Sequence, residues 1–431
     1  MKKRILITIV LQVFLILGSC SGPDSEPAVI PPVIEIKTAK ITSYSKDSGE
    51  TGETVSIYGE NFSDKASDIK ITFDGVAATI VSATATEIKF ILPKTEKVLP
   101  KLEFTIENRT ISKEVKNDYE GNIGILPARS FTDWVTQENN LDRDGETFNI
   151  QMESDKIVYF SSSLKTSDGG ITWQNWGGGS VFHATINNEG WSSGIGNPKM
   201  TKISAGGSIL TKEFANIENT TETYYCIYVD ANLKDGTVVA QSGKVYTTSN
   251  GIDFTKTYEL SGTKANLFQS TKIDNNHMWV IGYKPIKDKD GFSFNKPFIL
   301  FKNNTTDGWK EYPFVNEEPG YIAREINFVD NENGFLLINH YYQALLDVKL
   351  FKTNNGGDSW TQIYNNELFT KFTFKDANTG WAILDNKIYK TTNGGTAWTL
   401  DYTHDQKIGN IAYKNNVVWA FSKNKIIKRY L

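Results

Sequence analysis

The chain has 431 residues, which allows one large folded unit and one small one, and its formal net charge is −4. Aromatic residues make up 12% of the chain and charged residues 22%, with the two signs interspersed. Because no basic stripe is present to neutralise phosphates, nucleic acid is excluded as an expected partner.

Residues 1–20 are predicted to be a targeting segment. An apolar run over residues 5–17 follows three basic residues and is too short for a permanent membrane span. Residues 17–20, Leu-Gly-Ser-Cys, resemble the bacterial lipobox, in which the cysteine becomes the lipidated first residue of the mature protein. The resemblance implies a membrane anchor at Cys20, since each buried methylene of the acyl chains contributes about 0.8 kcal/mol. The alternative is an ordinary cleaved signal peptide.

Residues 21–33 are rich in proline and are predicted to form an extended tether. Ser21, and not aspartate, follows the cysteine, which by the enterobacterial sorting rule implies the outer membrane. Asp24 and Glu26 resemble part of the surface-export signal of Bacteroidota lipoproteins. The expected location is therefore the cell envelope, as an outer-membrane lipoprotein exposed at the surface.

Residues 34–116 are predicted to form a small all-β unit, because alternating apolar and polar runs are separated by Gly and Asp-Gly turns. Residues 59–62 (Gly-Glu-Asn-Phe) and 73–76 (Phe-Asp-Gly-Val) resemble the IPT/TIG domain, an immunoglobulin-like module. The resemblance implies a spacer, with a direct binding role as the alternative. Residues 112–124 are polar, contain two glycines and are predicted to be a linker.

An eight-residue motif, which we call the box, recurs in the rest of the chain at 166–173, 247–254, 353–360 and 391–398. It consists of Ser or Thr, any residue, usually Asp or Asn, any residue, Gly, two residues and an aromatic residue. The polar third residue can hydrogen-bond the amides of a tight turn, and the glycine can adopt a positive φ. The predicted structural residues of the boxes are Asp168, Gly170, Trp173, Gly251, Phe254, Asn355, Gly357, Trp360, Asn393, Gly395 and Trp398.

A second pattern, a strand, a polar turn and a strand that opens on an aromatic residue, precedes most boxes, as in residues 328–335 and 374–381. Box and pattern together predict units of four short strands, which is what a β-propeller blade requires. The box resembles the Asp-box, or BNR, repeat of sialidases. The combination is more similar to the propellers of photosystem II assembly factors and their bacterial relatives. This resemblance covers roughly residues 129–431 and implies a fold, with no activity attached.

The predicted fold class is therefore all-β, an immunoglobulin-like sandwich followed by a seven-bladed β-propeller over residues 125–431, with six blades as the alternative. The last unit contains only three strands, and residues 129–136 resemble the strand that follows a box. We expect them to complete that blade, because closure removes exposed sheet edges. The blades are expected at residues 144–176, 179–214, 222–259, 264–313, 320–364, 367–402 and 405–431, with worn boxes at 204–207 and 304–309.

Candidate ligand-binding residues lie in loops on the face opposite the boxes. The loops between second and third strands, such as 339–343, and the loops between blades carry aromatic rings beside amides and carboxylates, which suit sugars and peptides. The alternative is that these rings only cover the blade ends. The candidates are Trp176, Tyr283, Tyr312, Tyr321, His340, Tyr341 and Tyr342.

No catalytic residue, cofactor or metal is predicted. A sialidase needs three converging arginines, whereas the propeller contains only Arg129, Arg143, Arg324 and Arg429, two of them near its ends. Residues 142–146 resemble only a fragment of a calcium loop. The predicted function is a non-catalytic, lipid-anchored binding protein whose partner is a polysaccharide or an envelope protein. The alternative is a glycoside hydrolase or a sialidase-like enzyme on the propeller.

Overall fold

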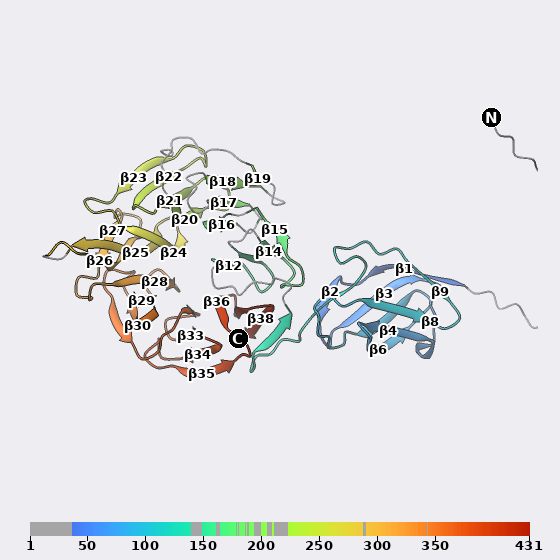
Figure 1. Cartoon of the computed structure of the whole chain (residues 1–431). Helices are drawn as coiled ribbons and strands as arrows, with labels where there is room; N and C mark the ends of the chain where they lie inside the picture. The colour runs from blue at the N-terminus through green and yellow to red at the C-terminus, as the bar shows by residue number, and fades with distance from the viewer. Residues whose placement is uncertain are drawn as a thin grey trace, which may run out of the picture.

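The structure is a computed structural model, and the elements of its described residues are all β-strands except one 3-10 turn, η1 (Ala66–Asp68) (Figure 1). Within the described part of the chain, no helix is apolar over a length that would cross a bilayer. The described residues are 37–138, 149–160, 164–177, 179, 181–185, 187, 189–193, 200–204, 209–210, 223–287, 290–342 and 344–431. The predicted targeting segment, the tether and residues 142–146 lie outside them.

The N-terminal unit is a sandwich whose core comes from the period-two alternation of its strands. Val55 and Ile57 of β3 (Thr54–Glu60), for example, are at most 1% exposed and face the core. Asp74 and Gly75 have φ values of 48° and 86°, as a two-residue hairpin turn of type I′ requires. In spatial order the sheets are β6 (Thr79–Ala83), β7 (Glu87–Ile91), β3 (Thr54–Glu60), β1 (Thr38–Tyr44) and β9 (Thr110–Lys113); β5 (Val76–Ala77), β4 (Ile69–Phe73) and β8 (Leu102–Ile106); and β10 (Gly124–Leu126) with β2 (Ser48–Glu50).

The predicted linker at 112–124 is wrong, because this segment is folded onto the sandwich. It begins inside β9 and ends at β10, which pairs in parallel with β2. Its polar residues make an ordered turn, in which Asn117 Oδ1 accepts the Gly121 N–H at 2.8 Å and Asn117 Nδ2 donates to Asn122 O at 2.9 Å. Ile123 is fully buried in the sandwich core. Polar composition here therefore reflects a hydrogen-bonded turn.

The C-terminal unit is a ring of sheets around a central axis (Figure 1), and the described residues contain seven sheets of four strands. We call each sheet a blade and number the blades 1–7 along the chain. Each begins with its innermost strand, and consecutive strands are antiparallel neighbours. Blades 1–3 are β12 (Ile150–Met152), β13 (Val158–Phe160), β14 (Leu164–Thr166), β15 (Gln174–Asn175); β16 (Val181–Ala184), β17 (Gly190–Ser193), β18 (Met200–Ile203), β19 (Ile209–Leu210); and β20 (Tyr224–Val229), β21 (Gly236–Ala240), β22 (Lys244–Thr248), β23 (Thr255–Glu259). Blades 4–7 are β24 (Asn266–Asp274), β25 (His277–Lys287), β26 (Ser293–Asn303), β27 (Lys310–Pro313); β28 (Tyr321–Phe328), β29 (Gly334–Tyr342), β30 (Ala344–Thr353), β31 (Thr361–Tyr364); β32 (Lys371–Phe374), β33 (Gly380–Leu384), β34 (Lys387–Thr391), β35 (Thr399–Thr403); and β36 (Ile408–Lys414), β37 (Val417–Ser422), β38 (Lys425–Tyr430) with β11 (Val135–Glu138).

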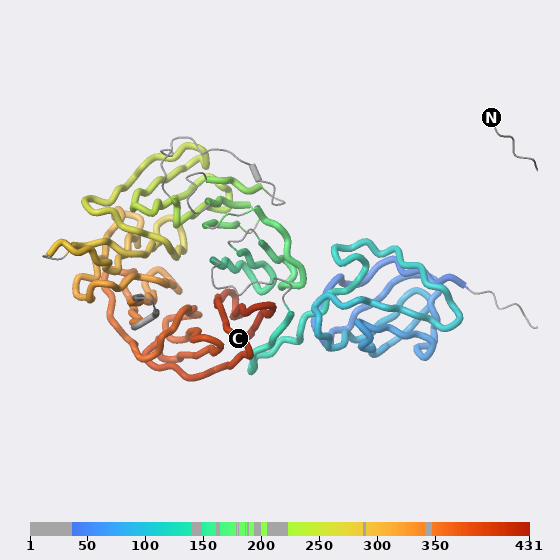
Figure 2. Tube along the Cα trace, in the orientation of Figure 1, coloured from blue at the N-terminus to red at the C-terminus, as the bar shows by residue number. Residues whose placement is uncertain are grey.

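The ring closes through both ends of the propeller, as expected (Figure 2). The segment that leaves the sandwich supplies β11, which pairs antiparallel with β38 near the C-terminus. The strand occupies 135–138, whereas 129–136 was predicted. The cause is a turn at its start, where Ser130 Oγ accepts the N–H of Asp133 at 2.9 Å. Phe131 is consequently 66% exposed and lies outside the strand.

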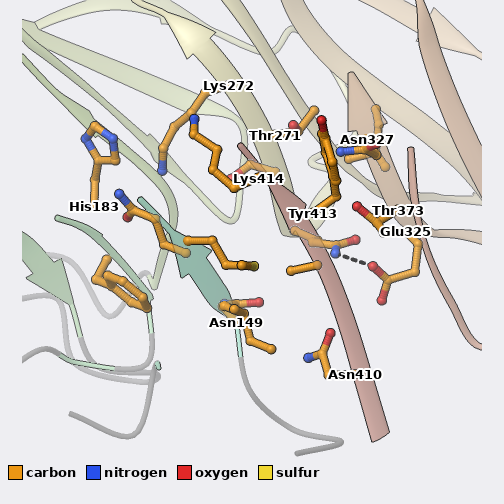
Figure 3. A pocket seen from close by; sticks show the side chains of 18 of the residues that line it. Asn149, His183, Thr271, Lys272, Glu325, Asn327, Thr373, Asn410, Tyr413 and Lys414 are labelled. Atoms are coloured by element: carbon orange, nitrogen blue, oxygen red, sulfur yellow. Dashed lines mark hydrogen bonds between the residues drawn. The ribbon is translucent and has the colours of Figure 1, made fainter. Parts of the chain in front are cut away.

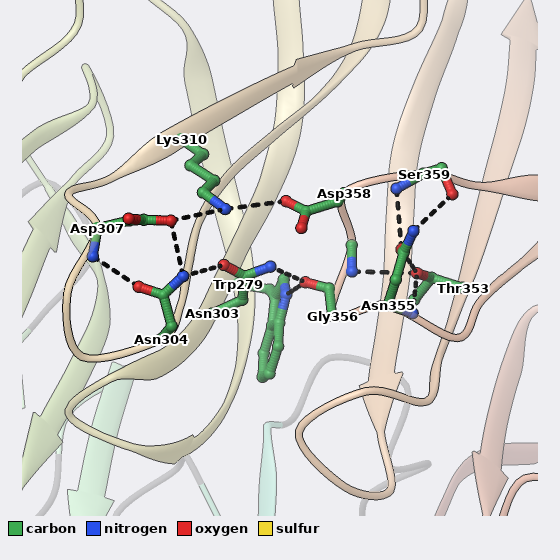
Figure 4. Close-up of polar contacts among 11 residues, drawn as sticks. Trp279, Asn303, Asn304, Asp307, Lys310, Thr353, Asn355, Gly356, Asp358 and Ser359 are labelled. Atoms are coloured by element: carbon green, nitrogen blue, oxygen red, sulfur yellow. Dashed lines mark hydrogen bonds and ion pairs between the residues drawn. The ribbon is translucent and has the colours of Figure 1, made fainter.

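Aromatic residues that open the second strands hold neighbouring blades together. Trp191, Trp279, Trp381 and Trp419 are fully buried. Trp279 of blade 4 stacks on Phe328 of blade 5 with ring centroids 3.5 Å apart. The indole also donates to the backbone oxygen of Gly356, in the box of blade 5, at 2.7 Å (Figure 4). Each of these rings therefore contributes to an interface between blades as well as to its own sheet.

The boxes form hydrogen-bonded turns between third and fourth strands. In blade 5, Thr353 Oγ1 accepts the N–H of Gly357 at 3.0 Å, and Asn355 Oδ1 accepts the N–H of Ser359 at 3.0 Å (Figure 4). Gly357 has a φ of 97°, which a residue with a Cβ adopts only with strain. The same pattern recurs around Asp168 and Asn393.

The box of blade 3 differs from its predicted register. Thr248 Oγ1 accepts the N–H of Gly251 at 3.1 Å, and Asn250 Oδ1 accepts the N–H of Asp253 at 2.8 Å. Threonine and asparagine therefore act one position later than the pattern at 247–254 predicted, in a turn shorter by one residue. Asn250, and not Ser249, supplies the acceptor, because its amide oxygen reaches two successive N–H groups.

The sandwich contacts the ring at the box of blade 1. Ile171 of that box is 1% exposed and packs with Val98, Tyr119 and Leu126. The Tyr119 hydroxyl donates to Asp168 Oδ2 at 3.0 Å, so the box aspartate serves both its own turn and the domain junction. Arg129 pairs with Glu50 of the sandwich at 2.6 Å and with Asp155 of blade 1 at 3.1 Å.

Candidate functional site

A cavity of about 540 Å³ lies on the axis of the ring, and we call it the channel (Figure 3). The innermost strands of all seven blades line it: β12, β16, β20, β24, β28, β32 and β36. Its volume is in the range of ordinary ligand pockets. Because every blade starts with its innermost strand, these strands all run in the same direction along the axis.

The channel wall is polar because alternate residues of each inner strand point in opposite directions. On β32, Phe372 and Phe374 are buried in the interfaces between blades. Thr373 and, from β28, Asn327 are among the side chains drawn in the channel wall in Figure 3. The apolar half of each strand thus builds the propeller, and the polar half is available to a ligand.

Side chains of the channel join neighbouring inner strands. Gln151 of blade 1 accepts the N–H of Ala184 at 3.0 Å and donates to the oxygen of the same residue at 2.6 Å. His183 Nδ1 accepts the N–H of Val229 at 3.0 Å, which places the proton of the neutral imidazole on Nε2. Burial lowers the pKa of His183 well below its ordinary value, so the ring is neutral. Hydrogen bonds therefore connect neighbouring inner strands of the wall without any ligand.

The carboxylates of the channel are already engaged. Glu325 is 8% exposed, forms an ion pair with Lys371 and accepts a hydrogen bond from Gln269 Nε2 at 2.6 Å. Glu153 accepts a hydrogen bond from Gln151 Nε2 at 2.5 Å. These are the carboxylates among the described lining residues. A carboxylate that already accepts hydrogen bonds from a lysine or an amide is committed to these partners and is poorly placed to act on a ligand.

Lys272 is a half-buried cation of the wall. Its ammonium donates to the backbone oxygen of Ile227 at 2.5 Å. Burial is the main influence on its pKa and lowers it, against smaller contributions from Cys226 and Glu153 that raise it. A partly desolvated ammonium is stabilised by an anion placed close to it.

The predicted ligand-binding residues are dispersed in the structure. Trp176 is 1% exposed and packs edge-on against Tyr159 and Phe182 at 5.0 and 5.2 Å, so it belongs to the core. Tyr283 accepts a hydrogen bond from Asn266 on β24 at 2.7 Å, and Tyr312 packs on a phenylalanine of the apolar cluster between blades 4 and 5. None of these three rings lines the channel.

Tyr321 and His340 do come together, at the start of β28, with ring centroids 5.1 Å apart. The Tyr321 hydroxyl donates to Asp347 Oδ2 at 2.5 Å, and Lys349 lies 4.5 Å from the ring centroid. Lys349 also pairs with a glutamate, so the cluster is satisfied internally. Residues 339–342 of the expected loop lie instead in β29. Tyr341 and Tyr342 lie in β29, with side chains outside the described set.

The described arginines of the propeller are each held in a separate place. Arg129 is at the domain junction, Arg429 Nη1 donates to both carboxylate oxygens of Asp401 on β35 at 3.0 Å, and Arg324 lies over the Phe268 ring. Arg143 lies outside the described residues. Within the described residues no group of three His, Cys, Asp or Glu side chains is placed to hold a metal ion.

The channel residues escaped detection in the sequence because they are spread over the inner strands of seven blades. Gln269, Glu325 and Lys371 form one hydrogen-bonded group, yet they come from three consecutive blades. One signal was present: polar residues just before the turn-and-aromatic pattern, in strands that otherwise alternate, as at Asn327 and Thr373. Only knowledge of the ring shows that these positions converge.

Comparison with known proteins identifies one domain. Residues 39–119 match the IPT/TIG domain model, and the N-terminal sandwich is therefore an IPT/TIG domain. No match was found among curated proteins. Solved structures with a similar fold include YCF48 bound to D1 peptide, at 12% identity and a TM-score of 0.47, covering 71% of this chain and 99% of that one. An auxiliary nutrient binding protein from Bacteroides thetaiotaomicron is similar at 14% identity and a TM-score of 0.35, covering 91% and 97%. BamB from Moraxella catarrhalis is similar at 11% identity and a TM-score of 0.40, covering 69% and 98%.

Proposed function

We propose that this chain is a non-catalytic binding protein of the cell envelope, anchored by lipid at Cys20, whose propeller binds a polysaccharide segment in the central channel. The IPT/TIG domain acts as a spacer between the anchor and the ring. The observation that carries the proposal is the channel itself, a polar cavity of about 540 Å³ lined by all seven inner strands.

Two features of the channel support binding over catalysis. Its amide and hydroxyl side chains, such as Asn327 and Thr271, can donate and accept hydrogen bonds, which suits the hydroxyls of a sugar ring. Its carboxylates are tied to Lys371 and to glutamine amides, whereas a glycosidase needs one free acid and one free base or nucleophile. A protein partner is the other possible outcome of the test below.

Filling the channel is expected to weaken ligand binding by at least about tenfold. The full chain, solubilised in detergent, is screened against an array of envelope and plant polysaccharide fragments and, in parallel, used to capture envelope proteins. Thr271→Trp places an indole in the channel wall, and Thr361→Trp, on the exposed outermost strand of blade 5, is the matched control. We expect the affinity of the first variant to fall by at least roughly tenfold and the affinity of the second to be unchanged.

Equal binding by the two tryptophan variants would place the ligand outside the channel and refute the proposal. Release of new reducing ends from a bound fragment would instead show an enzyme. Capture of an envelope protein with no binding to any glycan would select the protein partner.

Cys20→Ser is expected to release the protein from the membrane. The acyl chains supply the anchoring free energy, and one serine hydroxyl cannot carry them in the same linkage. Metabolic labelling with a palmitate analogue should mark the wild-type chain and Cys226→Ser but not Cys20→Ser, which should appear in the soluble fraction. Labelling that persists in Cys20→Ser would rule out the proposed anchor.

A further inference from the structure

We propose that the channel recognises an acidic sugar, with the carboxylate of a uronic acid bound at Lys272. This inference rests on the proposed function, because it names the chemistry of the ligand at the same site.

The lysines of the channel differ in whether a carboxylate is paired with them. Lys371 is paired with Glu325, and this pair is complete. Lys272 and Lys414 also line the channel, and neither forms an ion pair with another of the described residues. Lys272 lies two residues before the end of β24 and Lys414 is the last residue of β36, so both lie toward the same end of the axis. Glu153, directly after β12, acts on Lys272 only through space, so the two lysines at this end are not balanced by an ion pair within the described residues.

Lys272 has hydrogen-bonding capacity left for a ligand. An ammonium group has three donors, and the described chain uses one of them, toward Ile227 O. The group is half-buried, and burial lowers its pKa, so its charged form is under-solvated. A carboxylate of the ligand would replace the lost water and the missing counter-ion together, as a charge-assisted hydrogen bond.

The neighbouring groups favour a sugar over an acidic peptide. Gln269 lines the channel; its Nε2 is committed to Glu325, and its Oε1 is buried with no hydrogen-bond partner within the described chain. A buried acceptor without a donor is costly, and a turn of this side chain toward the channel would let a ligand hydroxyl satisfy it. Asn327 uses its Oδ1 to accept the N–H of Phe374, which leaves its Nδ2 to donate. Hydroxyl donors, hydroxyl acceptors and a carboxylate occur together on one uronic acid ring, which matches this set.

The test compares ligands that differ only in the carboxylate. Oligosaccharides of galacturonate, glucuronate and alginate, their carboxyl-reduced counterparts, and a poly-glutamate peptide are titrated into the detergent-solubilised full chain. We expect at least one uronate oligosaccharide to bind, and its carboxyl-reduced form to bind roughly tenfold more weakly or worse. Lys272→Met should lose a similar factor for the uronate ligand and little for the reduced one.

Two further variants distinguish the loss of a ligand contact from a loss of folded protein. Lys414→Met alters an exposed side chain at the channel mouth and should weaken uronate binding by a smaller factor. Lys70→Met, on an exposed position of the IPT/TIG domain, should change nothing. The thermal midpoint of each variant is measured alongside its affinity.

The possible results distinguish the acidic-sugar inference from the proposed binding function on which it rests. If reduced and acidic oligosaccharides bind equally, or Lys272→Met keeps its preference for acid, the acidic ligand is refuted while the binding function stands. Binding of poly-glutamate in place of every uronate also refutes it. If no oligosaccharide binds in a channel-dependent way, the proposed function fails as well.

Discussion

Trp279→Ala is expected to lower the free energy of unfolding of the propeller by about 3–5 kcal/mol, as for other fully buried large aromatic residues. The indole is 0% exposed and lies between blades 4 and 5, where it stacks on Phe328. Its removal leaves a cavity at an interface that both sheets share. Equilibrium unfolding in urea, followed by intrinsic fluorescence and far-UV circular dichroism, measures the change.

Two variants separate the cavity from the hydrogen bond. Trp279→Phe keeps most of the buried volume and loses the donor to Gly356 O, so it should cost only about 1–2 kcal/mol. Val315→Ala removes methyl groups from a side chain that is 66% exposed and should be nearly neutral. A Trp279→Ala variant no less stable than Val315→Ala would contradict the packing described between blades.

Lys428→Met is expected to stabilise the protein at pH 7 and to flatten its stability profile above that pH. Lys428 is 4% exposed, lies over the Trp419 ring and donates to Gly169 O, in the box of blade 1, at 2.7 Å. Burial lowers its pKa to about 7; Asp155, Asp168 and Glu50 act in the opposite direction and only partly offset burial.

The direction in which stability changes with pH follows from proton linkage. Between about pH 7 and the ordinary lysine pKa of 10.5, the unfolded chain holds a proton that the folded chain has released. Stability therefore rises with pH in this window, by up to about 1.4 kcal/mol per pH unit. Below pH 7 both states are protonated at this site and its contribution is constant. The Met variant has no such proton, and its interior no longer holds a desolvated charge.

Urea unfolding at pH 7, 8 and 9 provides the measurement, with Lys70→Met as the control that keeps the wild-type slope. The difference between wild type and Lys428→Met should shrink as the pH rises. Identical slopes for the two proteins would show that Lys428 is solvated in the folded state, and the contact between box 1 and β38 would then be looser than described.

The fold could be predicted largely because its signals are local. A box needs a hydroxyl, an amide or carboxylate and a glycine within five residues, and hydrogen bonds such as Thr391 Oγ1 with Gly395 N–H involve only those residues. The aromatic residue that opens each second strand marks a blade in the same way. Ring closure was also predictable, because residues 129–136 resemble an outer strand, but the turn capped by Ser130 moved the strand toward Glu138.

The site could not be predicted because it depends on distant parts of the chain. Trp176 looks like a surface aromatic beside glycines, yet the ring packs between Tyr159 and Phe182. Conversely, Lys272 sits in an ordinary strand pattern, and its position on the axis depends on the six other blades. The polar residues at 112–124 were predicted to be a linker, but side-chain hydrogen bonds of Asn117 order this segment against the sandwich.

The most direct test of this account is an experimental structure of the full chain with a bound oligosaccharide selected from the array. Ligand density inside the channel, within hydrogen-bond distance of Lys272 and Gln269, is the predicted result. Density over Tyr321 and His340 at the edge of blade 5, with the channel free of ligand, would contradict it.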